Sequence, residues 1–472
     1  MDKSKLIIEF KKIKDSMDGL ENMMMAHVNS LSERLSESDG SDDSSSIFLS
    51  EEDINDVTQL VYEYLDEYFQ NDTLTMSSPN FYQILIEDIT NITFEVMLDA
   101  NLCQEYHYNE VIELVDEIYE SYREFNTVPE RSYTMMNYKN QELNEDILSE
   151  LTQKIHLLSE MPQPQQRTKE WYEFRHGLIS ASNIWKAFGS DAQKNSLIYE
   201  KCCPLIDNTT KETNYVNTES PMHWGVKYEP VTVMIYEDMF NTEVGEFGCI
   251  QHAEYPFIGA SPDGINIDPT NEIYGRMVEI KNVVNRELTG IPKEDYWIQT
   301  QVQMETCDLD ECDFIETKCM EYHDESSFYE DDSRDYKGVI LHFIDNSNEY
   351  SAPTYAYMPL SVELNKEAIE CWIHKEKTKY SLENKALMNV AYWYLEDYSC
   401  VVIKRNKQWF DKALPIVKDI WNTILKERIE GYEHRAAKKR SPSIVLSSED
   451  GNTKNIKTDN HKSGLCLVKL DF

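Results

Sequence analysis

Apolar residues recur at helical spacing through the first part of the chain. Within residues 4–35, Leu6, Phe10 and Ile13 begin a seam that steps by four and three. This spacing is typical of a coiled-coil helix, and an amphipathic helix packed on its own domain has the same pattern. Residues 50–125 repeat the apolar stripe and predict an acidic helical region without candidate chemistry.

Beyond residue 165 the pattern mixes alternating runs with helical runs. Residues 277–281 alternate between apolar and polar positions, which predicts a strand, and a strand is also expected over 247–258. Further strands are expected over 314–319 and 338–343, and helices over 224–240, 295–304, 363–378 and 406–430. The sequence therefore predicts an α/β (α+β) fold in which a mixed sheet is flanked by helices.

Composition divides the chain into segments. We expect an amphipathic helix over 1–35, a disordered acidic, serine-rich linker over 36–49, an acidic helical region over 50–130, a connector over 131–165, a main domain with C-terminal helices over 166–432, and a disordered tail over 433–472. Within the main domain, the acidic stretch 322–336 has the composition of an insertion.

The chain is strongly acidic, and the charge is uneven. The formal net charge is −41, and residues 1–160 hold 35 Asp and Glu against 10 Lys and Arg, a net charge of −25. Proteins that grip DNA without sequence preference normally carry a basic surface. Any contact with DNA must therefore rely on local lysines, arginines and bound metal.

The ten cysteines form no recognisable framework. The sequence contains no C-x-x-C pair, which argues against a zinc ribbon or an iron–sulfur cluster. Buried free thiols in a reducing compartment are the default expectation. No signal peptide and no long apolar run is evident, so an intracellular location without membrane contact is expected.

The candidate chemistry centres on Asp263 and Glu279. Asp263 lies in a Ser-Pro-Asp-Gly turn, and Glu279 and Lys281 follow on one face of a predicted strand. Mg²⁺ prefers oxygen ligands and needs few of them from the protein, so two carboxylates and the backbone carbonyl of Ile280 would suffice. The spacing predicts a metal-dependent nuclease centre. An ordinary turn beside a solvated strand face would give the same residues.

Two neighbouring helices add candidates. Glu229 falls on the apolar stripe of the helix that ends at residue 240, where a carboxylate needs a partner such as a metal. Arg175 precedes Ser182, which we expect to be the N-cap of the next helix. An arginine beside a helix N-terminus is a natural phosphate site, and a salt-bridged surface arginine is the simpler interpretation.

Four blocks, in order, resemble the phage lambda exonuclease and YqaJ-type viral recombinase nucleases, a branch of the PD-(D/E)xK superfamily. The blocks are W-x-x-x-R-x-G-x-I-x-A-S (171–182), G-x-x-x-E (225–229), S-P-D-G with E-I-K (261–281), and Q-V-Q (301–303). The resemblance covers roughly residues 165–345 and implies a restriction-endonuclease-like core.

The resemblance also implies roles for individual residues. It implies that Asp263, Glu279 and Lys281 are catalytic together with Glu229, and that Asp263, Glu279, Glu229 and the Ile280 carbonyl hold two Mg²⁺ or Mn²⁺ ions. Arg175, Ser182, Ser261 and Gln301 fall where the family recognises a 5′-phosphate. The family's members degrade one strand of duplex DNA from a 5′ end, so the expected partners are DNA ends, a single-strand annealing protein and further copies of the chain.

Two alternatives remain open. A structure-specific endonuclease on the same core would use the same residues. An inactive nuclease fold that serves as a scaffold, with the acidic helices as its working part, would not need charges clustered at a strand end. In either active form the enzyme would serve viral-type recombination, repair or genome processing. Cleavage of linear and closed-circular duplex with and without Mg²⁺ separates these possibilities.

Overall fold

The computed structural model describes residues 47–437, except 48, 72, 127, 141, 167, 206–216, 219 and 348–351. The expected helix over 1–35, nearly all of the linker and most of the tail lie outside the described residues. The described chain forms two compact units, each treated by itself below. The first unit holds the residues up to Tyr138 with Ile291–Gln301 and Val402–Pro415, and the second holds Lys139–Gly290, Val302–Val401 and the residues from Ile416.

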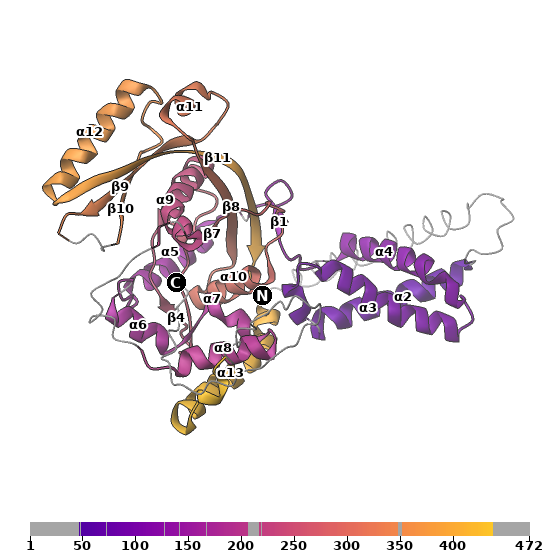
Figure 1. Cartoon of the computed structure of the whole chain (residues 1–472). Coiled ribbons are helices and arrows are strands. Elements are labelled where there is room, and N and C mark those ends of the chain that lie inside the picture. Colours follow the sequence, from indigo (N-terminus) through magenta and orange to yellow (C-terminus); the bar gives the residue numbers. More distant parts are fainter. Residues whose placement is uncertain are drawn as a thin grey trace, which may run out of the picture. The chain divides into compact units, whose positions relative to one another are not determined.

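The first unit is built on three helices (Figure 1). These are α2 (Glu51–Asn71), α3 (Phe81–Asp99) and α4 (Tyr108–Phe125), with 3₁₀ turns at Thr73–Ser77 and Glu105–His107 and the short strand β1 (Tyr133–Thr134). Apolar residues at helical spacing, such as Val57, Val61 and Leu65, are buried between the helices. Most of the described residues between 51 and 125 thus lie in helices.

The second unit contains most of the remaining elements. Its helices are α5 (Glu145–Glu160), α6 (Lys169–His176), α7 (Ala181–Ile184), α8 (Asp191–Cys202), α9 (Pro221–Phe240), α11 (Glu325–Glu330) and α12 (Lys366–Leu382), with 3₁₀ turns at Trp185–Ala187 and Glu433–Arg435. The boundary between the units falls inside α10 (Glu294–Cys307) and α13 (Lys407–Glu430), and Val402–Lys404, the end of β11 (Lys385–Lys404), also belong to the first unit. Within the described part of the chain, no helix has the length and apolarity needed to cross a bilayer.

A mixed sheet organises the second unit. Its strands are β3 (Val244–Gly245), β6 (Gly264–Asn266), β7 (Met277–Asn282), β8 (Glu311–Glu321), β9 (Lys337–Asp345), β10 (Thr354–Tyr357) and β11 (Lys385–Lys404), in the order β10-β9-β11-β8-β7-β6-β3. β7 and β8 run parallel, whereas β6–β7 and β9–β10 are antiparallel. β2 (Ile179–Ser180), β5 (Ile258–Ala260) and β4 (Ile250–Gln251) form a smaller sheet. The predicted mixed sheet flanked by helices is confirmed.

Helix α9 covers one face of β7 and β8. Tyr236 of α9 packs in one apolar cluster with Val278 and Ile280 of β7 and with Ile315 of β8. Residues that alternate along β7 must point to opposite faces, so Glu279 and Lys281 lie on the face away from this cluster. The packing of α9 thus fixes which side of the sheet carries the candidate chemistry.

A second core is formed by the segment that lies between β8 and β11 in the sequence. Residues 322–384, here called the arm, contain α11, β9, β10 and α12, which lie together in Figure 1. Phe328, Leu341 and Trp372 of the arm belong to one buried cluster. The predicted insertion 322–336 is thus the first part of a larger element with its own core.

Three expectations need correction. The predicted connector 131–165 contains helix α5, whose N-cap Asn144 accepts a hydrogen bond from the backbone of Ile147. Ser182 lies inside α7, and Ser180 occupies the N-cap position. The 20-residue strand β11 had no counterpart among the expected elements.

Candidate active site

Asp263 is held in a tight turn between β5 and β6. Gly264 follows it, and a Cβ atom at that position would lie 2.1 Å from Cγ1 of Val244 on β3. Only glycine therefore lets β6 approach β3 this closely. Asp263 Oδ2 accepts a hydrogen bond from the backbone N–H of Ile280 at 2.7 Å, which ties the turn to the middle of β7.

Glu279 and Lys281 lie side by side on β7, as the period-two pattern predicts. The Lys281 ammonium pairs with Glu279 Oε1. The Glu279 side chain is only 1% exposed, whereas that of Lys281 is 22% exposed. A buried carboxylate needs a cation or hydrogen-bond donors, and Lys281 supplies part of this requirement.

Gln303 of α10 supplies the other part. Its Nε2 donates to Glu279 Oε2 at 2.7 Å and to the Ser261 carbonyl at 3.2 Å. Its buried Oε1 has no hydrogen-bond partner among the described residues. Gln303 thus joins the Ser-Pro-Asp-Gly turn to β7.

Gln301, the glutamine predicted for the site, has different partners. Its Nε2 donates to the Lys404 carbonyl at 2.9 Å, and its Oε1 accepts from the backbone of Asn406 at 2.7 Å. Both the amide nitrogen and the amide oxygen of Gln301 are therefore hydrogen-bonded to backbone groups. The glutamine that contacts Glu279 is Gln303, two positions along the same helix.

Asp263, Glu279, Lys281 and Gln303 are called the carboxylate–lysine cluster below. Burial and the negative charge of Glu279 raise the pKa of Asp263 well above its ordinary value, and Glu229 adds to the rise. The Lys281 charge and the hydrogen bond from Ile280 act in the opposite direction. Without a further cation beside Lys281, the Asp263 carboxyl therefore favours its neutral form.

Glu229 lies on α9 and influences the cluster through its charge. The sequence placed it on an apolar stripe, but the residue is exposed, as is Val226 one turn earlier. Its carboxylate therefore avoids the desolvation cost that the apolar stripe suggested. Glu229 nevertheless approaches Asp263 closely enough to raise the pKa of that carboxyl group.

Arg175 and two serines form a second group, the arginine–serine cluster. Arg175 Nη2 donates to Ser180 Oγ at 3.3 Å, and Ser180 Oγ lies 3.1 Å from Ser182 Oγ. The guanidinium stacks over the Trp171 ring, with 4.7 Å from Cζ to the ring centroid. The sequence predicted Arg175 and Ser182 but missed Ser180, the residue that joins them.

Ser261 lies between the two clusters. Burial raises the pKa of the Cys249 thiol, and the Ser261 hydroxyl and the Arg175 charge both oppose that rise. Ser261 is thus close to the thiol that Arg175 also influences, while its carbonyl accepts from Gln303. Ser261 and Cys249 thus connect the surroundings of Arg175 with those of Gln303, whereas Gln301 bonds to the backbone of Lys404 and Asn406.

The donor set fits a hydrated hard cation better than an enclosed one. Among the described residues, no three His, Cys, Asp or Glu side chains converge closely enough to surround a metal ion. Mg²⁺ commonly takes one or two carboxylates and keeps several waters. Asp263 and Glu279 are two carboxylates that could serve in this way, and the buried Oε1 of Gln303 is an acceptor without a described partner.

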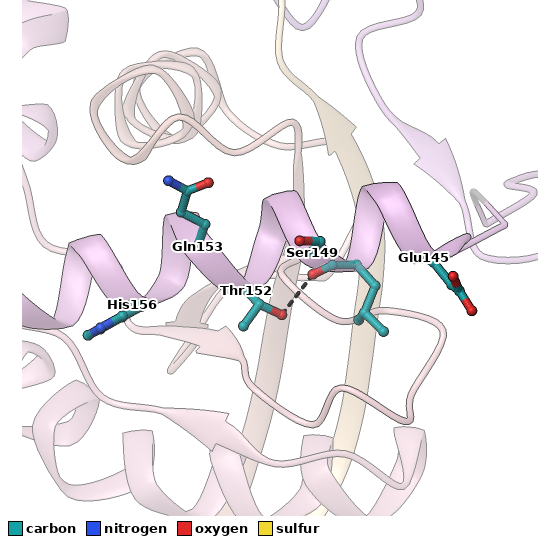
Figure 2. A pocket seen from close by; sticks show the side chains of 6 residues that line it. Glu145, Ser149, Thr152, Gln153 and His156 are labelled. Carbon is teal, nitrogen blue, oxygen red and sulfur yellow. Dashed lines mark hydrogen bonds between the residues drawn. The ribbon is translucent and has the colours of Figure 1, made fainter.

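The pocket in Figure 2 is unrelated to these clusters. It lies along α5 and is lined by Glu145, Leu148, Ser149, Thr152, Gln153 and His156. The Thr152 hydroxyl donates to the Leu148 carbonyl at 2.7 Å and accepts from the Tyr274 hydroxyl at 3.1 Å, so its polar group is already used. None of the predicted site residues lines this pocket.

The region that holds both clusters matches a known family. Residues 170–310 match the YqaJ-like viral recombinase domain. The family resemblance predicted from the four sequence blocks is thereby confirmed for this part of the chain.

The chain is also similar to individual proteins, at low sequence identity. An uncharacterised protein of Acanthamoeba polyphaga mimivirus is 29% identical over 306 residues, which cover 58% of this chain and 54% of that protein. The chain thus spans about half the length of this curated relative. The alkaline exonuclease of Laribacter hongkongensis, solved by itself and in complex with dAMP, has a TM-score of 0.34 and 19% identity, covering 57% of this chain and 97% of that enzyme.

Proposed function

We propose that this chain is a metal-dependent deoxyribonuclease that degrades duplex DNA from a 5′ end. The premise is the match of residues 170–310 to the YqaJ-like viral recombinase domain. The observation that carries the proposal is the contact of Lys281 and Gln303 with the same buried carboxylate, beside Asp263. A role in viral-type recombination, repair or genome processing follows from the family, as do an annealing partner and self-association.

The carboxylates would hold the cation. Asp263, Glu279 and the Ile280 carbonyl would bind it, and Glu229 would add charge from α9. When bound, a divalent cation polarises a phosphoryl oxygen and lowers the pKa of a coordinated water. Gln303 fixes the orientation of Glu279 through Oε2. Lys281, the more exposed partner of that carboxylate, would orient the attacking water beside the phosphodiester.

The arginine–serine cluster would bind the terminal 5′-phosphate. A guanidinium and two hydroxyls that are already hydrogen-bonded to each other present several donors to one anion. The Trp171 ring limits the movement of the guanidinium. Recognition of an end in this way favours exonuclease over endonuclease action.

End-labelled linear duplex and closed-circular duplex, each with and without Mg²⁺, test the proposal. We expect Mg²⁺-dependent release of nucleotides from 5′-labelled linear DNA and no loss of the closed circle. Mn²⁺ should replace Mg²⁺. Asp263→Ala should remove this activity.

Asp268→Asn is the matched control. Asp268 lies in the next connection, between β6 and β7, and among the described contacts its side chain accepts hydrogen bonds only from exposed Thr270, at 2.9 and 2.7 Å. It should leave cleavage unchanged. Nicking of the closed circle would make the enzyme an endonuclease. No Mg²⁺-dependent cleavage of either DNA would reject the proposal.

A further inference from the structure

A further carboxylate, Glu316, lies on β8 beside β7. Glu316 of β8 is the register partner of Lys281 of β7. Register partners on adjacent strands point to the same face of a sheet, so Glu316 shares the face of Glu279 and Lys281. Its side chain is 2% exposed. Negative charge is thus buried one strand away from the carboxylate–lysine cluster.

Arg286 neutralises this carboxylate. It lies in the segment between β7 and α10, and its Nη2 pairs with Glu316 Oε1. Without this partner, Glu316 would be a buried unpaired charge and would compete with Glu279 for the Lys281 ammonium. The pair therefore leaves Lys281 associated with Glu279.

The guanidinium of Arg286 is not fully buried. Its side chain is 28% exposed, in contrast to its partner. An arginine carries five N–H donors, and the other contact described for Arg286 is a long one, from Nη1 to the Glu287 carbonyl at 3.5 Å. The guanidinium is thus anchored on one side and accessible on the other.

We propose that Arg286 is a substrate-binding residue that contacts a DNA phosphate next to the one that is cleaved. Glu316 is its positioning residue, because the buried carboxylate fixes where the guanidinium lies. The inference rests on the proposed nuclease function. An arginine fork binds phosphate oxygens in two parallel hydrogen bonds, which matches a nucleic acid backbone better than a point charge does.

The salt dependence of DNA binding tests this contact. The probe is a fluorescent 20-bp duplex with a 5′-phosphate, titrated in Ca²⁺ after a gel has confirmed that it stays intact. Each lost phosphate contact lowers the slope of log Kd against log salt by about 0.9. Arg286→Ala should lower it by that amount and weaken binding about 10- to 150-fold. Arg286→Lys should restore the slope, because the charge remains, with only part of the affinity.

Steady-state kinetics then distinguish the binding role of Arg286 from the positioning role of Glu316. Arg286→Ala should raise KM more than it lowers kcat if the contact exists before and during cleavage. Glu316→Gln keeps the shape and loses the anchoring charge, so it should raise KM less and leave the salt slope unchanged. Arg334→Ala is the matched control, because Arg334 is 30% exposed and pairs with Glu396 at 2.9 Å in the same unit. It should change neither quantity.

The outcomes are distinct. A folded Arg286→Ala protein with the wild-type slope and affinity overturns the inference, provided that Asp263→Ala abolishes cleavage. The inference is also overturned if Arg286→Lys has the same slope as Arg286→Ala, since loss of packing would then be the cause. If Asp263→Ala cleaves like the wild type, the proposed function fails and the inference falls with it.

Discussion

The helical bundle of the first unit and the site of the second use acidic residues in opposite ways. Residues 51–125 contain 19 Asp and Glu and a single Arg. In the bundle most of the described acids are exposed and the others are half-buried, and tyrosine hydroxyls donate to some of them, as Tyr82 does to Asp116 and Tyr122 to Asp66. In the site, Glu279 and Glu316 are almost fully buried and each is paired with a cation.

The difference teaches that position, rather than number, decides what a carboxylate does. A solvated carboxylate is surrounded by water of high dielectric constant, so its interactions with other charges are weak. A buried one must have partners, and those partners fix its geometry. The bundle acids therefore contribute together to a long-range negative electrostatic potential. Each acid of the site instead interacts with particular neighbours at defined distances.

The largest effect should come from the site carboxylates. Asp263→Ala or Glu279→Ala should lower Mg²⁺-dependent DNA degradation by about 10³-fold or more, because the stabilisation that a bound cation supplies amounts to several kcal/mol. Single-turnover cleavage of end-labelled duplex measures this loss, and circular dichroism checks the fold. Near wild-type rates in either variant would show that the site lies elsewhere.

The next effect concerns end recognition. Arg175→Ala should lower kcat/KM on 5′-phosphorylated duplex by about 10- to 150-fold, the range for a charge-assisted hydrogen bond of about 1.5–3 kcal/mol. Its activity on 5′-hydroxyl ends should change little. Competition between the two kinds of end measures the preference. If the variant keeps the wild-type preference for phosphate, Arg175 does not read the end.

The buried ammonium group of Lys201 should make the stability of the second unit depend on pH. Burial lowers the pKa of Lys201 from 10.5 to about 8. Between these values the unfolded chain binds a proton that the folded chain lacks, so stability rises with pH across this window. Relative to Lys201→Met, the wild type should gain up to about 3 kcal/mol from pH 8 to pH 10.5. Urea unfolding measures the difference, and parallel curves would contradict it.

The smallest effect should come from the bundle. Glu87, Glu95 and Asp99 are exposed on α3, and replacing them by Gln, Gln and Asn removes part of the long-range negative potential. Cleavage should become slightly faster at low salt and unchanged at physiological salt, where the Debye length is about 8 Å. The exposed neutral residue Gln83, changed to Ala, is the control. An equal gain at every salt concentration would point to a local structural cause.

Deletion of the first 138 residues is a poorer test of how the bundle's negative charge affects cleavage. Trp297 and Trp409 belong to the first unit, are 1% exposed and meet edge to face at 5.4 Å. The Trp297 indole donates to the Arg131 carbonyl at 2.7 Å. Truncation would uncover these rings, so loss of activity would report misfolding as readily as a catalytic role.

Local chemistry made part of the site predictable. The turn that holds Asp263 and the alternation that places Glu279 beside Lys281 involve residues close together in sequence, where steric rules decide the geometry. The choice between the two glutamines of α10 was different. Residues two apart on a helix point about 200° from each other, so only one faces the site, and the tertiary packing of α10 selects Gln303.

Long-range pairing limited the prediction of the fold. Strand β11 pairs with β9 through a register shift between Leu387 and Asn389, and the partner strand lies some 40 residues earlier in the sequence. A local pattern contains neither the partner nor the irregularity. Ser180 was missed for a related reason, because its value as a link between Arg175 and Ser182 depends on the turn that precedes α7.

The arm's core, against which residues of β11 also pack, has a consequence for local unfolding. Phe343, Ile369 and Trp372 pack within the arm, and β10 pairs only with β9 in the described sheet. A segment with its own core can unfold as a cooperative unit at a lower free energy than the whole protein. Amide protons of β10 should therefore exchange with solvent together with those of α12, and earlier than those of β7, whose strand neighbours lie on both sides.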